Sequence, residues 1–77
     1  MYPEAVSEIL VFKTNIAREE DLIKVASVID NDPRIMQWNV DREDIDHVLR
    51  IEASRIMAPD VISIVHKAGF ECEELPD

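Results

Sequence analysis

The chain has 77 residues, of which 47% are hydrophobic and 32% are charged. This composition is typical of one folded domain around one hydrophobic core, and the length excludes a second domain. The 17 acidic and 8 basic residues give a formal net charge of -9. Because the basic residues are scattered and this charge repels phosphates and anionic headgroups, we expect neither a nucleic-acid partner nor a membrane partner.

Cysteine usage and the N-terminal residues bear on the compartment. Cys72 is the single cysteine, so no intrachain disulfide and no Cys-x-x-Cys pair can form. Residues 1–8 have neither the basic region nor the apolar core of a signal peptide, and no apolar run reaches membrane-spanning length. We therefore expect a cytoplasmic protein.

The first half of the chain predicts a strand followed by a helix. Residues 9–12 are an apolar run of β-favouring residues. The helix is expected over residues 18–30, with acidic residues in its first turn and a capping oxygen from Thr14 or Asn15. Its apolar stripe recurs at three- and four-residue spacing and consists of Leu22, Val25, Ala26 and Ile29. Pro33 and the two residues before it end the helix.

The second half predicts a hairpin, a helix and a last strand. Residues 36–41 alternate between apolar and polar side chains, residues 42–46 form a polar connection, and residues 47–53 return as a strand. Pro59 opens a second helix at residues 58–68, and Gly69 ends it in a left-handed conformation. Residues 70–75 complete the pattern as an acidic strand.

The predicted order β, α, β, β, α, β is that of a ferredoxin-like α+β fold. Two right-handed crossovers flank a hairpin, which gives a four-stranded antiparallel sheet with two helices on one face. We expect residues 9–75 to form this single domain and residues 1–8 to form an N-terminal extension. The opposite sheet face remains open to solvent or to another protein.

Residues 9–75 resemble the heavy-metal-associated domains of copper chaperones and metal-pumping ATPases. The similar segments are the helix stripe of residues 22–29, the hairpin segments Trp38-Asn39-Val40-Asp41 and Val48-Leu49-Arg50-Ile51-Glu52, and the helix end Lys67-Ala68-Gly69-Phe70. The resemblance implies a metal loop at residues 13–18, where that family carries Met-x-Cys-x-x-Cys. This chain has Lys13, Asn15 and Arg18 at the methionine and the two cysteines. Since monovalent copper is held by thiolates, and guanidinium repels a cation, we expect no metal there.

A small anion is an alternative ligand for the same loop. Thr14, Asn15 and Arg18 lie next to the predicted helix N-terminus, which favours negative charge. The acidic residues of the first helical turn already occupy that field, so a simple helix cap is the competing interpretation.

Other classical ligands and catalytic groups are poorly arranged. His47, His66 and Cys72 are not at metal-ligand spacing. The acidic residues of the hairpin connection lack the mid-loop glycine of a calcium loop; they are Asp41, Glu43, Asp44 and Asp46. With a single glycine and no nucleophile motif, the chain offers no catalytic residues and no cofactor loop, so we expect no enzyme.

The open sheet face gives the strongest functional indication. Only alternate strand residues can face the helices, yet both central strands contain consecutive apolar residues. The register of the family that the chain resembles implies that Ile9, Val11, Leu49 and Ile51 point inward. An apolar patch then remains on the open face if the first and third strands are neighbours; it consists of Leu10, Phe12 and Val48. Such a patch commonly marks a protein interface, and a self-complementary one gives a homodimer. Alternatively, these are isolated apolar residues of an ordinary surface, or residues 1–7 fold back over them.

The sequence therefore predicts a non-enzymatic, metal-free interaction module that acts through its sheet face. The alternative is a metal or small-ligand carrier that uses the first loop, or Cys72 with the histidines. Trp38 shares the parity of Met36 and Val40, so we expect it at the core or its rim.

Overall fold

The computed structural model describes residues 7–76. Its elements in chain order are β1 (Glu8–Thr14), α1 (Glu19–Ile29), β2 (Ile35–Asp41), β3 (Val48–Ala53), α2 (Ala58–Lys67) and β4 (Cys72–Glu74). Each predicted element is present, and its ends lie within two residues of the predicted ones. The extension proposed for residues 1–8 falls mostly outside the described residues.

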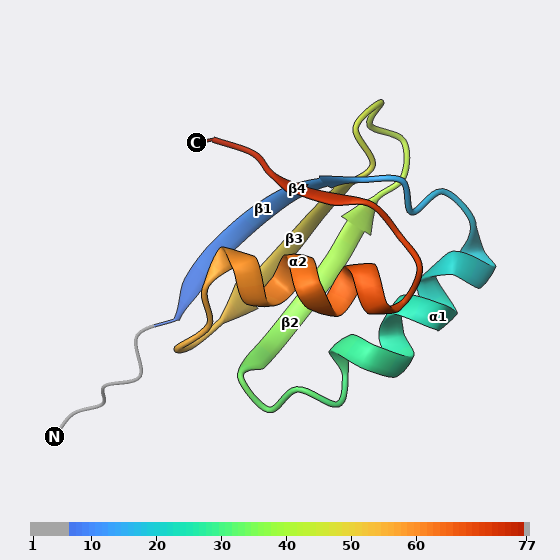
Figure 1. Cartoon of the computed structure of the whole chain (residues 1–77). Coiled ribbons are helices and arrows are strands. Elements are labelled where there is room, and N and C mark those ends of the chain that lie inside the picture. Colours follow the sequence, from blue (N-terminus) through green and yellow to red (C-terminus); the bar gives the residue numbers. More distant parts are fainter. Residues whose placement is uncertain (1–6, 77) are drawn as a thin grey trace, which may run out of the picture.

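The strands form one antiparallel sheet in the order β2-β3-β1-β4. Both helices lie on the same side of this sheet, and β4 runs along the edge next to α2 (Figure 1). The predicted ferredoxin-like α+β fold is confirmed. One sheet face is thus covered by helices and the other is open.

The core lies between the sheet and the two helices. Strands β1 and β3 contribute Phe12, Leu49 and Ile51, which have no exposed surface. The helices contribute their predicted stripes, with Val25 and Ile29 from α1 and with Val61 and Val65 from α2. Burial of one such side chain contributes about 1.5–3 kcal/mol, so this layer supplies most of the driving force for folding.

The predicted orientation of β1 is wrong. Phe12 pairs with Leu49 and Leu10 pairs with Ile51, and residues directly opposite each other in an antiparallel pair point to the same face. Phe12 is therefore in the core, Leu10 packs against the core, and Ile9 is 57% exposed. The four-residue apolar run has no alternation of its own, and packing places its largest side chain inside.

Carboxylates one turn into each helix hold the helix N-termini. The Asp21 carboxylate accepts hydrogen bonds from the backbone N–H groups of Ala17 and Arg18, at 3.2 and 3.0 Å. The Asp60 carboxylate accepts the N–H of Met57 at 3.1 Å. The prediction that Thr14 or Asn15 caps α1 is wrong, because both side chains bond elsewhere.

The end of α2 follows the prediction. Gly69 has a φ of +96°, a value that L side chains rarely adopt. Its N–H donates to the carbonyl of His66, and the N–H of Phe70 donates to that of Val65. These two bonds satisfy carbonyls of the last turn and direct the chain into β4.

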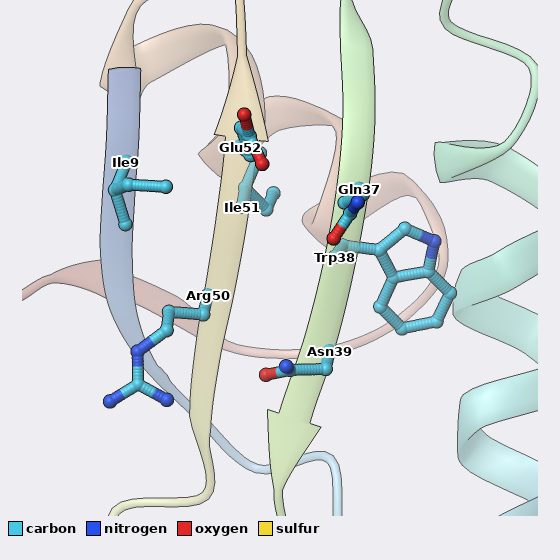
Figure 2. A pocket seen from close by; sticks show the side chains of 7 residues that line it. All are labelled: Ile9, Gln37, Trp38, Asn39, Arg50, Ile51 and Glu52. Atoms are coloured by element: carbon cyan, nitrogen blue, oxygen red, sulfur yellow. The ribbon is translucent and has the colours of Figure 1, made fainter. Parts of the chain in front are cut away.

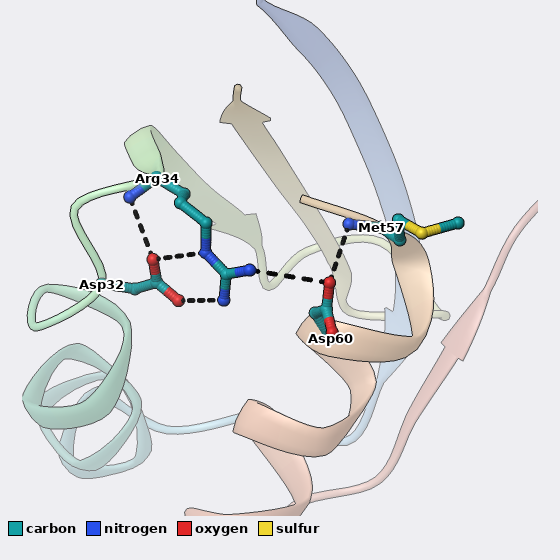
Figure 3. A network of polar contacts seen from close by, with 4 residues as sticks. All are labelled: Asp32, Arg34, Met57 and Asp60. Carbon is teal, nitrogen blue, oxygen red and sulfur yellow. Dashed lines mark hydrogen bonds and ion pairs between the residues drawn. The ribbon is translucent and has the colours of Figure 1, made fainter. Parts of the chain in front are cut away.

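Arg34 links the end of α1 to the start of α2. Its guanidinium makes two hydrogen bonds to Asp32, at 3.0 and 2.7 Å, and lies 3.7 Å from Asp60 at the start of α2 (Figure 3). The Arg34 hydrogen bond holds the pKa of Asp32 below its usual value. Trp38 also reaches the helical layer, since its indole N–H donates to Asp30 at 2.9 Å. This confirms Trp38 at the rim of the core.

Candidate functional site

The loop between β1 and α1 is closed by its own hydrogen bonds. The Thr14 hydroxyl donates to the carbonyl of His47 at 2.6 Å and accepts the N–H of Ile16 at 3.2 Å. The side-chain oxygen of Asn15 accepts the N–H of Glu71 at 2.9 Å. Both side chains are therefore used to join the loop to the hairpin and to the start of β4.

The helix N-terminus beside this loop already holds an anion. The carboxylate of Asp21 occupies the backbone donors of residues 17 and 18, and the bond from Arg18 N–H lowers the pKa of Asp21. The Arg18 side chain is exposed and pairs with Glu20 at 3.2 Å. Thr14 ends β1, and Asn15 and Arg18 follow in the loop, but the polar atoms of these three side chains do not converge on one position.

The remaining soft ligands are also poorly placed for metal. Cys72 is 8% exposed within the core cluster, and burial raises the pKa of its thiol to about 12. Nδ1 of His47 is buried without a hydrogen-bond partner among residues 7–76. His66 is exposed on α2. Over the same residues, no group of three or more His, Cys, Asp or Glu side chains forms a metal-ligand set.

The open face of the sheet carries a regular arrangement of side chains. Strand pairing places outward residues of β1, β3 and β2 side by side in two rows. We call the first the glutamate row, which in strand order consists of Ile9, Glu52 and Gln37. We call the second the arginine row, which consists of Val11, Arg50 and Asn39. Each strand thus contributes the same kind of side chain to both rows. Strand β1 contributes aliphatic side chains, β3 contributes charged ones, and β2 contributes amides.

Arg50 is the basic residue of the two rows, and it makes no ion pair with another described residue. The ion pairs within residues 7–76 use Lys13, Arg18 and Arg34, and none uses Arg50. Its side chain leans from β3 over β1, below Ile9 (Figure 2). A shallow hollow of about 90 Å³ lies on this face and is lined by residues of β1, β2 and β3, among them Ile9, Arg50 and Glu52. The face therefore combines exposed apolar surface with an available guanidinium.

The predicted interface residues behave differently from one another. Phe12 has no exposed surface and Leu10 is half-buried against the core, so neither forms an open patch. Val48 has the outward parity of Arg50 and lies outside the core cluster, but it is only 8% exposed. Sequence reasoning missed Ile9 and Arg50 as the accessible members of the face. Arg50 could have been identified from the sequence, because it alternates with the apolar residues Leu49 and Ile51 along β3.

Comparison with known proteins adds fold information. No family model matches the chain, and no curated protein matches it in sequence. The apo HMA domain of a copper chaperone for superoxide dismutase superposes with a TM-score of 0.78 at 10% identity, over 99% of this chain and 74% of that one. Oxidized MerP from Ralstonia metallidurans CH34 gives 0.77 at 9% identity, over 92% and 100%. The yeast copper transporter domain Ccc2a gives 0.74 at 11% identity, over 90% and 96%.

These likenesses define the fold class. The chain is a small ferredoxin-like α+β domain, and within that class it has the fold of heavy-metal-associated domains. It lacks the Met-x-Cys-x-x-Cys motif, since Cys72 is its single cysteine. Among residues 7–76 no helix has the length and apolarity needed to cross a bilayer.

Proposed function

We propose that this protein is a non-enzymatic interaction module that binds a protein partner through its open sheet face and carries no metal. The observation behind the proposal is the combination on that face of Ile9, which is 57% exposed, with Arg50, which makes no ion pair within residues 7–76. Exposed apolar surface beside an arginine is typical of the residues that dominate protein interfaces. A single, buried thiol suits the reducing cytoplasm that we propose as its compartment.

The first loop supports the metal-free part of this proposal. A carrier must offer vacant, soft ligands to the ion. At the family's two cysteine positions this chain has Asn15, whose oxygen is bonded to Glu71, and Arg18, whose positive charge opposes a cation. The loop is thus built as a structural connection between β1, the hairpin and β4.

A pair of matched substitutions tests the proposed face. Ile9→Glu places a charge on the open face, while Ile23→Glu places one on α1, where Ile23 is 68% exposed. We expect sedimentation and affinity capture to show association by the wild type and by Ile23→Glu, and loss of it in Ile9→Glu. Equal behaviour of all three proteins would contradict the proposal.

The alternative, a metal or small-ligand carrier, is favoured only by the fold of the neighbours, one of which is described as Cu(I)-loaded. Titration with monovalent copper and with zinc under reducing conditions separates the two functions. Our proposal predicts no binding tighter than micromolar. Tight binding that disappears in Cys72→Ala would support the carrier instead.

A further inference from the structure

The partner that best fits the open face is a second copy of this chain. We propose that two copies stack face to face about a two-fold axis that runs across the strands, between the glutamate row and the arginine row. This inference rests on the proposed function and specifies the partner. It follows from the order of the side chains within the two rows.

A two-fold operation of this kind exchanges the rows while each strand lies over its own copy. In such an interface, if residue i contacts residue j, then j contacts i. Ile9 of one copy then lies over Val11 of the other, and Gln37 lies over Asn39. Arg50 lies over Glu52, and the symmetry repeats this ion pair. Every contact therefore joins aliphatic to aliphatic, amide to amide, or acid to base.

The distances suit these contacts. Sheets that pack face to face are about 10 Å apart, with strand directions that differ by about 30°. Arginine and glutamate side chains are long enough to meet across that gap. The two rows span only three strands. The rotation between the sheets therefore moves their side chains little from the positions directly opposite their partners.

Charge also favours this face over the rest of the surface. The chain has a net charge of -9, so two copies repel each other through most orientations. The two rows contain one acid and one base, Glu52 and Arg50, and are neutral together. Among residues 7–76, Glu52 accepts one side-chain hydrogen bond, which the Ser7 hydroxyl donates to one of its oxygens at 3.1 Å. Its other oxygen remains available to the partner's guanidinium.

Charge reversal tests the geometry. The two single variants, Arg50→Glu and Glu52→Arg, each place like charges opposite each other at both symmetric positions. We expect sedimentation at low salt to show a dimer for the wild type and a loss of roughly tenfold or more in the association constant for each variant. Both sites are on the surface, and circular dichroism checks that the variants fold.

Recombination makes the test specific for the two-fold arrangement. In the Arg50→Glu variant both position 50 and position 52 are acidic, and in the Glu52→Arg variant both are basic. In an equimolar mixture these opposite charges face each other, so a heterodimer should form. The double variant Arg50→Glu/Glu52→Arg should dimerise by itself. A wild type that stays monomeric at its highest soluble concentration, or variants that fail to recombine, would overturn the inference. If a monomeric wild type still captures another protein through Ile9, the proposed function survives while the dimer does not.

Discussion

The two faces of the sheet use the same strands for opposite purposes. On the covered face, Phe12, Leu49 and Ile51 fill the space below two helices and are fully buried. On the open face, Ile9, Arg50 and Glu52 alternate with them along β1 and β3 and reach the surface. The comparison shows that one strand can supply stability at every second residue, while the residues between them reach the open face, where we propose that recognition takes place.

Thiol reactivity gives the largest expected difference between the faces. Burial raises the pKa of Cys72 to about 12, so at pH 8 it should react with a disulfide reagent roughly a thousandfold more slowly than an unperturbed thiol. A cysteine placed on the open face by Ile9→Cys, in a Cys72→Ala background diluted until it is monomeric, should react at the unperturbed rate. Absorbance of the released thiolate measures both rates. Fast labelling of folded wild type would contradict the buried position of Cys72.

Truncation of a core residue gives the next largest effect. Phe12→Ala removes a fully buried ring and should lower the free energy of unfolding by about 3–5 kcal/mol. Ile9→Ala, on the opposite face of the sheet, should change the free energy of unfolding by only about 0.5 kcal/mol. Urea denaturation of both variants decides the orientation of β1. The reverse ranking would restore the orientation predicted from sequence.

A smaller effect is expected where α2 ends and the chain turns into β4. Gly69→Ala puts a Cβ on a residue with φ of +96°, although no atom lies within 4 Å of that Cβ. The cost is therefore conformational, and we expect a loss of about 1–2 kcal/mol in the free energy of unfolding. Ala68, a neighbour with φ of -78°, offers a control as Ala68→Ser. If thermal unfolding shows Ala68→Ser to be less stable than Gly69→Ala, the positive φ of residue 69 is not the source of the strain.

The smallest effect concerns the Arg34 bridge between the helices on the covered side. Arg34→Met removes the hydrogen bonds that keep the pKa of Asp32 lowered. A lowered carboxyl pKa contributes stability above the unfolded value, near 3.8, and that contribution is lost as pH falls through the folded value. We expect the gap in stability between wild type and variant to be present at pH 7 and to narrow below pH 3.8. If the difference in stability between wild type and Arg34→Met does not change with pH, it comes from the packing of Arg34 and not from its bond to Asp32.

Most of the fold was predictable from local signals. The stripe of α1, Pro59 at the start of α2 and Gly69 at its end each act within a few residues, and each predicted element is present. The orientation of β1 was not predictable in this way, because Ile9 to Phe12 are all apolar and either parity satisfies the local pattern. Their orientation depends on pairing with β3, which lies about 40 residues away in the sequence.

The candidate site was predictable only in part. The sequence places Thr14, Asn15 and Arg18 close together, but it does not reveal that the Thr14 hydroxyl bonds to His47 and Ile16 or that Asn15 accepts the N–H of Glu71. Nor does it reveal that Asp21 occupies the backbone N–H groups of Ala17 and Arg18. Likewise, the alternation in β3 shows Arg50 facing outward, whereas its place between Val11 and Asn39 depends on register. Side chains that meet through pairing of distant strands require the structure.

Residue-resolved amide chemical shifts, recorded as the protein is diluted, test most directly whether recognition uses the open face. Self-association through the two rows predicts shifts that depend on concentration at Ile9, Arg50 and Glu52, with little change at Asn15 and Arg18. Shifts confined to the loop between β1 and α1, or shifts there on addition of monovalent copper with an unaffected sheet face, would contradict it.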